Sequence, residues 1–134
     1  MTFDWADYLE LAKQLIEPDS LSGVSVECCQ RCAASRAYYA ALGRAAAYLK
    51  QVIGDDLPDD HTFHEIVISR FCHHGERSWR RVGEWLNELR EYRKDADYYE
   101  DAANWLKNAT ASVIRSRDAI HALEEIFNGP PSPM

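Results

Sequence analysis

The stretch LREYRKDADYY (residues 89–99) carries the residue types that bind anionic groups. Arg93 falls where the apolar rhythm of the preceding helical stripe calls for another apolar side chain. That stripe consists of Trp79, Val82, Leu86 and Leu89. An arginine fork donates hydrogen bonds to phosphate or carboxylate in a fixed geometry, and its stem can cover apolar surface. The pattern therefore indicates an anion-binding role for Arg93.

A structural role for the same residues stays open. Arg93 can pair with Asp95 or Asp97 and lock a turn between two helices. Asp97, followed by Glu100, has the composition of a helix N-cap. Arg36 can line a groove with Arg93 or tie two helices together.

The histidines near residues 61–74 are the candidates for proton transfer, because imidazole titrates close to neutral pH. Among them, His64 can face Arg93 from another helix and act as a base. Trp85 and Tyr92, seven residues apart and off the apolar stripe, suit a dimer or partner surface.

The cysteines offer a weaker signal. Cys29 and Cys32 form a CxxC pair, and Cys72-His73-His74 could complete a zinc site. However, Cys28 and Cys32 fall on a predicted apolar stripe, where a thiol behaves as a small hydrophobe. We therefore expect no metal and no cofactor.

Composition sets the class of protein. The chain has 134 residues and a net charge of −7, which argues against indiscriminate coating of nucleic acid. Two basic segments, 31–50 and 70–94, stand in this acidic background. No apolar run is long enough for a bilayer, and the acidic N-terminus does not resemble an export signal. We expect a cytoplasmic protein with reduced thiols and no membrane contact.

Helical spacing of apolar residues runs through the chain and predicts an all-α antiparallel bundle of about five helices. The expected helices cover about 4–16, 27–53, 62–74, 77–93 and 98–127. A stripe from Cys28 and Cys32 through Ser35 to Ile53 marks the packing face of the second helix, and Thr62 with Glu65 forms a capping-box pattern. We expect one domain over residues 1–128 and a disordered tail over 129–134.

Two segments resemble one known family. LNELREYRKDADY (86–98) is similar to the fourth-helix ending of HEPN domains, and SRAYYAALGRAAAYL (35–49) resembles their second-helix signature. The resemblance implies a small helical bundle, a homodimer, and pairing with a small nucleotidyltransferase in a two-gene toxin–antitoxin module.

The resemblance also implies a site. In the ribonuclease members, an arginine is followed after four to six residues by a histidine. Here Arg93 is followed by Lys94 and, after four residues, by Tyr98 in place of histidine. Tyrosine, with a pKa of about 10, is a poor base at neutral pH, so ribonuclease activity is doubtful. The resemblance further implies that Tyr98 or Tyr99 can receive nucleotidyl groups.

The sequence thus predicts a protein that binds RNA or a nucleotide phosphate. The expected binding residues are Arg36, Arg93, Lys94, Asp97 and Tyr98, and Arg93 and His64 are the candidates for catalysis. Two alternatives stay open: a non-catalytic helical adaptor for protein contacts, and a metal-independent ribonuclease.

Overall fold

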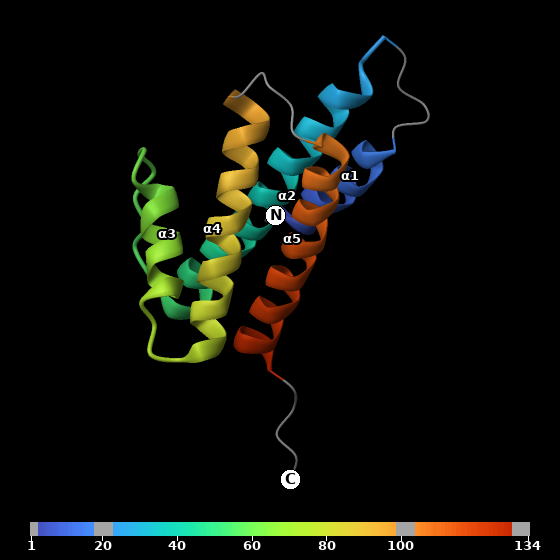
Figure 1. Cartoon of the computed structure of the whole chain (residues 1–134). Helices are drawn as coiled ribbons and strands as arrows, with labels where there is room; N and C mark the ends of the chain where they lie inside the picture. The colour runs from blue at the N-terminus through green and yellow to red at the C-terminus, as the bar shows by residue number, and fades with distance from the viewer. Residues whose placement is uncertain (1–2, 18–22, 99–103, 130–134) are drawn as a thin grey trace.

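The computed structural model describes residues 3–17, 23–98 and 104–129 (Figure 1). Within these ranges the regular structure is entirely helical, which confirms the predicted all-α bundle. The helices are α1 (Ala6–Ile16), α2 (Val26–Tyr48), α3 (Phe63–Cys72), α4 (Arg77–Tyr98) and α5 (Trp105–Asn128). A π-helical turn, Leu49–Ile53, prolongs α2 and ends at Gly54, whose φ of 84° suits glycine.

Helix α2 is the centre of the bundle, in contact with α1, α4 and α5. Its middle turns are rich in alanine, and these small side chains let three helices approach it closely. The packing face predicted from Cys28 and Cys32 is wrong at this end: both thiols are exposed, and Cys29 is buried instead. Since several faces of α2 are covered, the apolar spacing alone does not identify one packing side.

Helices α4 and α5 run antiparallel, side by side, and α3 lies along the outer side of α4 (Figure 1). The apolar stripe predicted for α4 is confirmed, because Trp79, Val82, Leu86 and Leu89 are all buried. The predicted end of this helix at Arg93 is wrong, since α4 continues to Tyr98. The intervening residues include no glycine or proline, so nothing in them interrupts the helix.

The helix starts also differ from the prediction. Helix α5 begins at Trp105, and the side chain of Asn104 accepts a hydrogen bond of 3.0 Å from the Lys107 amide. Asp97 therefore lies inside α4 and does not cap α5. The predicted capping box at α3 does not form, because the Thr62 hydroxyl donates to Asp60 and makes no cap bond.

Two further points delimit the description. No helix of the described ranges is both long and apolar enough to cross a lipid bilayer. Of the tail predicted over 129–134, only Gly129 lies among the described residues, and Tyr99 lies outside them.

Candidate functional site

Arg93 sits on the last turns of α4 and reaches from the bundle interior to its surface. Its side chain is 12% exposed. The guanidinium carbon Cζ lies 5.4 Å from the ring centroid of Tyr38, which is fully buried, and 5.9 Å from that of Tyr98, which is 72% exposed. Each such cation–ring contact is worth about 0.5–2 kcal/mol, depending on desolvation. The charge is thus held at the edge of the core.

The carboxylate that faces Arg93 satisfies it only in part. Arg93 Nη1 lies 3.6 Å from Asp97 Oδ2, an ion pair along the helix at a distance longer than a hydrogen bond. Arg93 Nε is buried and has no hydrogen-bond partner among the described residues. A guanidinium has five N–H donors, so this side chain keeps donors for an added acceptor.

Arg90 lies one turn before Arg93 and on the same side of α4. It is half-buried, and its Nε is likewise buried with no acceptor in the described part of the chain. No described carboxylate pairs with Arg90, and its charge acts on Tyr38 and His64. Two neighbouring arginines on one helix face therefore carry incompletely satisfied charges.

Arg36 approaches the same place from α2. Its Cζ lies 4.8 Å from the Tyr8 ring centroid and 5.2 Å from that of Tyr39. Arg93 Cζ lies 5.8 Å from the centroid of the same Tyr39 ring. One aromatic ring thus connects the two cations. We call Arg36, Arg90 and Arg93 the arginine cluster.

His64, on α3, joins the cluster through Tyr38. The Tyr38 hydroxyl lies 2.7 Å from His64 Nδ1, and the two rings stack with centroids 5.6 Å apart. Burial, reinforced by the charges of Arg90 and Arg93, lowers the pKa of His64 below its ordinary value. Burial also raises the pKa of Tyr38 to about 12, although the positive charges of the two arginines act to lower it. At neutral pH both partners are therefore uncharged.

The structure brings four of the five predicted binding residues together and separates Lys94 from them. Lys94 Nζ pairs with Glu91 at 3.5 Å on an exposed part of α4. Asp97 faces Arg93 as its carboxylate partner, and Tyr98 offers an exposed ring beside it. Arg36, Arg93, Asp97 and Tyr98 thus gather around one place, and the contacts of Lys94 are elsewhere.

Arg90, Tyr38 and Tyr39 complete this site and were not predicted as part of it. Arg90 precedes Arg93 by three residues, and that spacing places the two side chains together on any helix. The tyrosines are adjacent in the sequence. Tyr39, four residues after Ser35, continues the stripe predicted for the second helix, whereas Tyr38 lies off that stripe. The meeting of Tyr38 with His64 has no local sequence signal, because it depends on how α2 and α3 cross.

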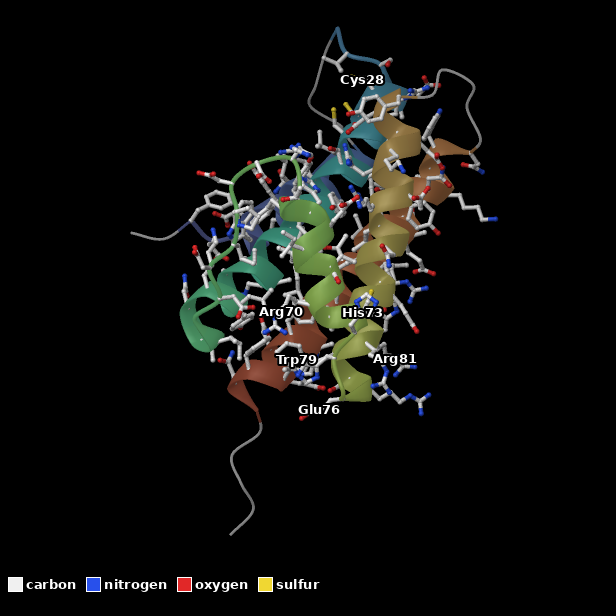
Figure 2. The ribbon with its side chains drawn as sticks, turned by 90° about the vertical axis from the view of Figure 1, so that its left-hand side faces the viewer. Cys28, Arg70, His73, Glu76, Trp79 and Arg81 are labelled. Atoms are coloured by element: carbon white, nitrogen blue, oxygen red, sulfur yellow. The ribbon has the colours of Figure 1, made fainter. Side chains whose placement is uncertain are left out.

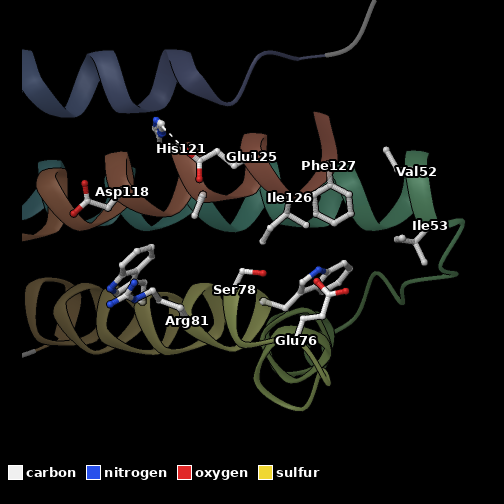
Figure 3. Close-up of a pocket in the computed structure, with 13 residues that line it drawn as sticks. Val52, Ile53, Glu76, Ser78, Arg81, Asp118, His121, Glu125, Ile126 and Phe127 are labelled. Carbon is white, nitrogen blue, oxygen red and sulfur yellow. Dashed lines mark ion pairs between the residues drawn. The ribbon is translucent and has the colours of Figure 1, made fainter. Parts of the chain in front are cut away.

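A separate groove of about 940 Å³ lies between α4, α5 and the π-helical turn (Figure 3). Trp79, Trp85, Ile126 and Phe127 give it apolar walls, with Val52 and Ile53 at one end. Glu76, Arg81, Asp118, His121 and Glu125 form its polar rim, where His121 Nε2 lies 3.7 Å from Glu125 Oε1. Trp85, predicted for a partner surface, is half-buried here and covered by Arg81, whose Cζ is 5.5 Å from its ring centroid.

The cysteines and histidines do not converge. Cys28 lies at the opposite end of the molecule from Trp79 and Glu76, with His73 well removed from it (Figure 2). Partial desolvation of the thiol and the neighbouring Cys28 raise the pKa of Cys32. Across the described ranges, no three His, Cys, Asp or Glu side chains come close enough to hold a metal ion.

Comparisons with known proteins give no relative from which a function could be transferred: no protein family, curated protein or solved structure matches the chain.

Proposed function

We propose that the chain binds phosphate groups of RNA or of a nucleotide at the arginine cluster. The observation that carries this proposal is the state of Arg90 and Arg93. Both have a buried Nε without an acceptor among the described residues, one turn apart on the same helix. An unsatisfied buried donor costs about 1–3 kcal/mol. Arg44 also has a buried Nε without an acceptor, but it pairs with Asp4 and Glu124, whereas no described carboxylate pairs with Arg90.

A phosphate group offers what these arginines lack. Its oxygens accept several hydrogen bonds at once, and the guanidinium fork matches them in pairs. Its negative charge also offsets the repulsion between the neighbouring cations, which is strong where water is excluded. The Asp97 carboxylate, 3.6 Å from Arg93, cannot both accept several hydrogen bonds from the two arginines and offset the repulsion between them.

The aromatic residues of the site favour a nucleic acid or nucleotide over a bare anion. Tyr98 presents an exposed ring beside Arg93, and Tyr39 lies between Arg93 and Arg36. A base that stacks on such a ring gains about 1–3 kcal/mol whatever its identity. The predicted phosphate site therefore has neighbours that suit the rest of a nucleotide.

The biological setting belongs to the same proposal. The two HEPN-like segments, 35–49 and 86–98, support a protein that forms a homodimer and pairs with a nucleotidyltransferase in a two-gene module. The neighbouring gene should then encode a small nucleotidyltransferase. Incubation of the two proteins with nucleoside triphosphates should add a nucleotidyl mass to the peptide that contains Tyr98, as read by mass spectrometry.

Binding to single-stranded RNA, measured by fluorescence anisotropy, tests the phosphate site directly. Arg93→Gln and Arg90→Gln should each weaken binding by about tenfold or more, because a charge-assisted hydrogen bond contributes about 1.5–3 kcal/mol. Each should also reduce the salt dependence of binding. Arg117→Gln is the matched control, since Arg117 is an α5 arginine with 61% of its side chain exposed. Unchanged affinity in folded Arg93→Gln protein would refute the phosphate site.

A second candidate function, a metal-independent ribonuclease, is favoured by the position of His64. Its Nδ1 is engaged by the Tyr38 hydroxyl, and its lowered pKa keeps the ring neutral at pH 7. In the tautomer in which Nδ1–H donates to the Tyr38 oxygen, Nε2 carries a lone pair that can accept the proton of a ribose 2′-hydroxyl. The arginines would then stabilise the charge that develops on the phosphate.

Incubation of purified protein with RNA in the presence of a chelator distinguishes binding from cleavage. Cleavage that disappears in His64→Gln, while RNA affinity persists, would establish the ribonuclease. Intact RNA bound with an affinity that depends on Arg93 would leave phosphate binding as the function.

A further inference from the structure

One face of α2 borders a second hollow that the proposed phosphate site does not use. This hollow, which we call the α2 cavity, has a volume of about 410 Å³, within the range typical of small-molecule sites. It is lined by Trp5, Tyr39, Leu42, Gly43, Ala46, Ala47, Lys50, Gln51, Phe63 and His64. The lining comes from the chain before α1, from α2 and its π-helical turn, and from the start of α3.

Gly43 allows this wall to form. A methyl group at Gly43 would overlap the Trp5 indole, so only glycine lets that ring lie against the backbone of α2. At the other end, Lys50 Nζ lies 5.5 Å from the Phe63 ring centroid. The lining therefore combines aromatic rings with a cation.

Such a lining suits a flat ring that carries polar edge groups. Trp5, Tyr39 and Phe63 supply aromatic rings for stacking, and Leu42, Ala46 and Ala47 add apolar side chains to the lining. Gln51 offers an amide with both donors and acceptors, which is the complement of a nucleobase edge.

The cavity adjoins the arginine cluster at two residues, Tyr39 and His64. Tyr39 and His64 line the cavity, and both also contact or face the cluster. Arg36 lies one turn before Tyr39 on the same face of α2, with its Cζ 5.2 Å from the Tyr39 ring centroid. A ligand whose ring occupies the cavity can thus extend a charged group past Tyr39 to Arg36 and Arg93.

We infer that the α2 cavity is the nucleobase subsite of the phosphate site, so that the ligand is a nucleoside 5′-phosphate unit. The inference rests on the proposed phosphate binding and assigns the part of the ligand next to the phosphate. The unit can be a free mononucleotide or one residue of an RNA strand, since the two share the same chemistry.

Isothermal titration with matched probes tests the inference. The probes are the 5′-monophosphates of adenosine, guanosine, cytidine and uridine, ribose 5-phosphate, and a 5′-phosphorylated hexanucleotide. At least one mononucleotide should bind tenfold or more tightly than ribose 5-phosphate, which has no base. A hexanucleotide that binds more tightly than every mononucleotide would identify RNA as the source of the unit, and the opposite order would identify a free nucleotide.

Variants that fill the cavity, or that remove one of its aromatic rings, test whether the base binds there. Ala47→Leu should weaken mononucleotide binding at least tenfold and leave the affinity for ribose 5-phosphate within twofold. Phe63→Leu keeps an apolar residue and should act in the same direction if Ala47→Leu does not fold. Ala122→Leu is the matched control, a half-buried alanine that lines the α4–α5 groove instead.

The outcomes separate this inference from the proposed function. Equal affinity for mononucleotides and ribose 5-phosphate, both weakened by Arg93→Gln, would overturn the base subsite and keep the phosphate site. If Ala122→Leu loses the preference for mononucleotides over ribose 5-phosphate while folded Ala47→Leu or Phe63→Leu keeps it, the base lies in the α4–α5 groove. That result would overturn the inference. Mononucleotide binding that is insensitive to Arg93→Gln would overturn the phosphate site, and this inference with it.

Discussion

The hydroxyl of Tyr38 and Nδ1 of His64 lie 2.7 Å apart, although 26 residues separate them in the sequence. Tyr38 is fully buried at the middle of α2, and His64 lies in the first turn of α3. The contact fixes the orientation of the imidazole ring beside Arg90 and Arg93. It thus sets both the packing of α3 and the chemistry available at the arginine cluster.

Replacement of Tyr38 by phenylalanine should destabilise the fold by about 1–2 kcal/mol, because the hydrogen bond is lost and the partly buried His64 ring is left without its partner. Chemical denaturation measured by circular dichroism gives the free energy of unfolding. Tyr48→Phe is the matched control, since the Tyr48 hydroxyl accepts from Asn128 at 3.1 Å in an exposed contact. That change should cost less than about 0.5 kcal/mol. Equal costs at the two positions would contradict the importance of the buried contact.

The pH dependence of stability should report the environment of His64. The pKa of His64 is lowered in the folded protein, so below about pH 6.5 the unfolded chain binds this proton more readily than the folded chain. The free energy of unfolding should therefore fall as the pH drops from 7 towards the lower folded pKa of His64. Urea unfolding of wild type and His64→Gln across this window isolates the effect. The variant should show a weaker dependence on pH, and identical slopes would argue against a lowered pKa.

The sequence predicted the helices better than their ends. Apolar spacing identified all five helices and the buried stripe of α4, because packing on a core demands that spacing. The end of α4 was placed at Arg93 on the strength of the charges that follow, yet charged residues continue a helix as well as they end one. The fifth helix was likewise predicted to begin near residue 98, whereas α5 begins at Trp105.

The candidate site was predictable in part. Arg93 stood out because it breaks an apolar stripe, and the structure does hold its stem in the bundle interior. The position of Arg90 beside Arg93 was also predictable, because residues three apart lie on the same side of a helix. The approach of Tyr38, Tyr39 and His64 depends on the crossing of α2 with α3, which no local pattern encodes.

The start of α5 offers a test of a capping interaction that the sequence did not predict. Asn104→Ala should cost about 1 kcal/mol, because the Asn104 side chain accepts a hydrogen bond from the Lys107 amide. Thr110→Ala, at an exposed position inside the same helix, is the control and should change stability by less than about 0.5 kcal/mol. A negligible effect of Asn104→Ala on the thermal midpoint would show that the helix start does not depend on this cap.

The contact between α3 and α4 leaves no room for a side chain at Gly83. A methyl group there would lie 2.6 Å from Cys72 Sγ and 2.7 Å from the Cys72 backbone nitrogen. The thiol can rotate away, but the backbone cannot, so α3 and α4 would have to separate. Gly83→Ala should therefore destabilise the protein by about 1–3 kcal/mol, even though alanine favours a helix by about 1 kcal/mol over glycine.

Gly75→Ala provides the control for this prediction. Gly75 has ample space around it and is not among the described glycines with positive φ, so alanine should be tolerated there with little change in stability. Because α3 begins at Phe63, which lines the α2 cavity, separation of α3 from α4 should also weaken RNA binding in Gly83→Ala but not in Gly75→Ala. Stability and RNA affinity unchanged in Gly83→Ala would mean that the two helices have more freedom than their close approach implies.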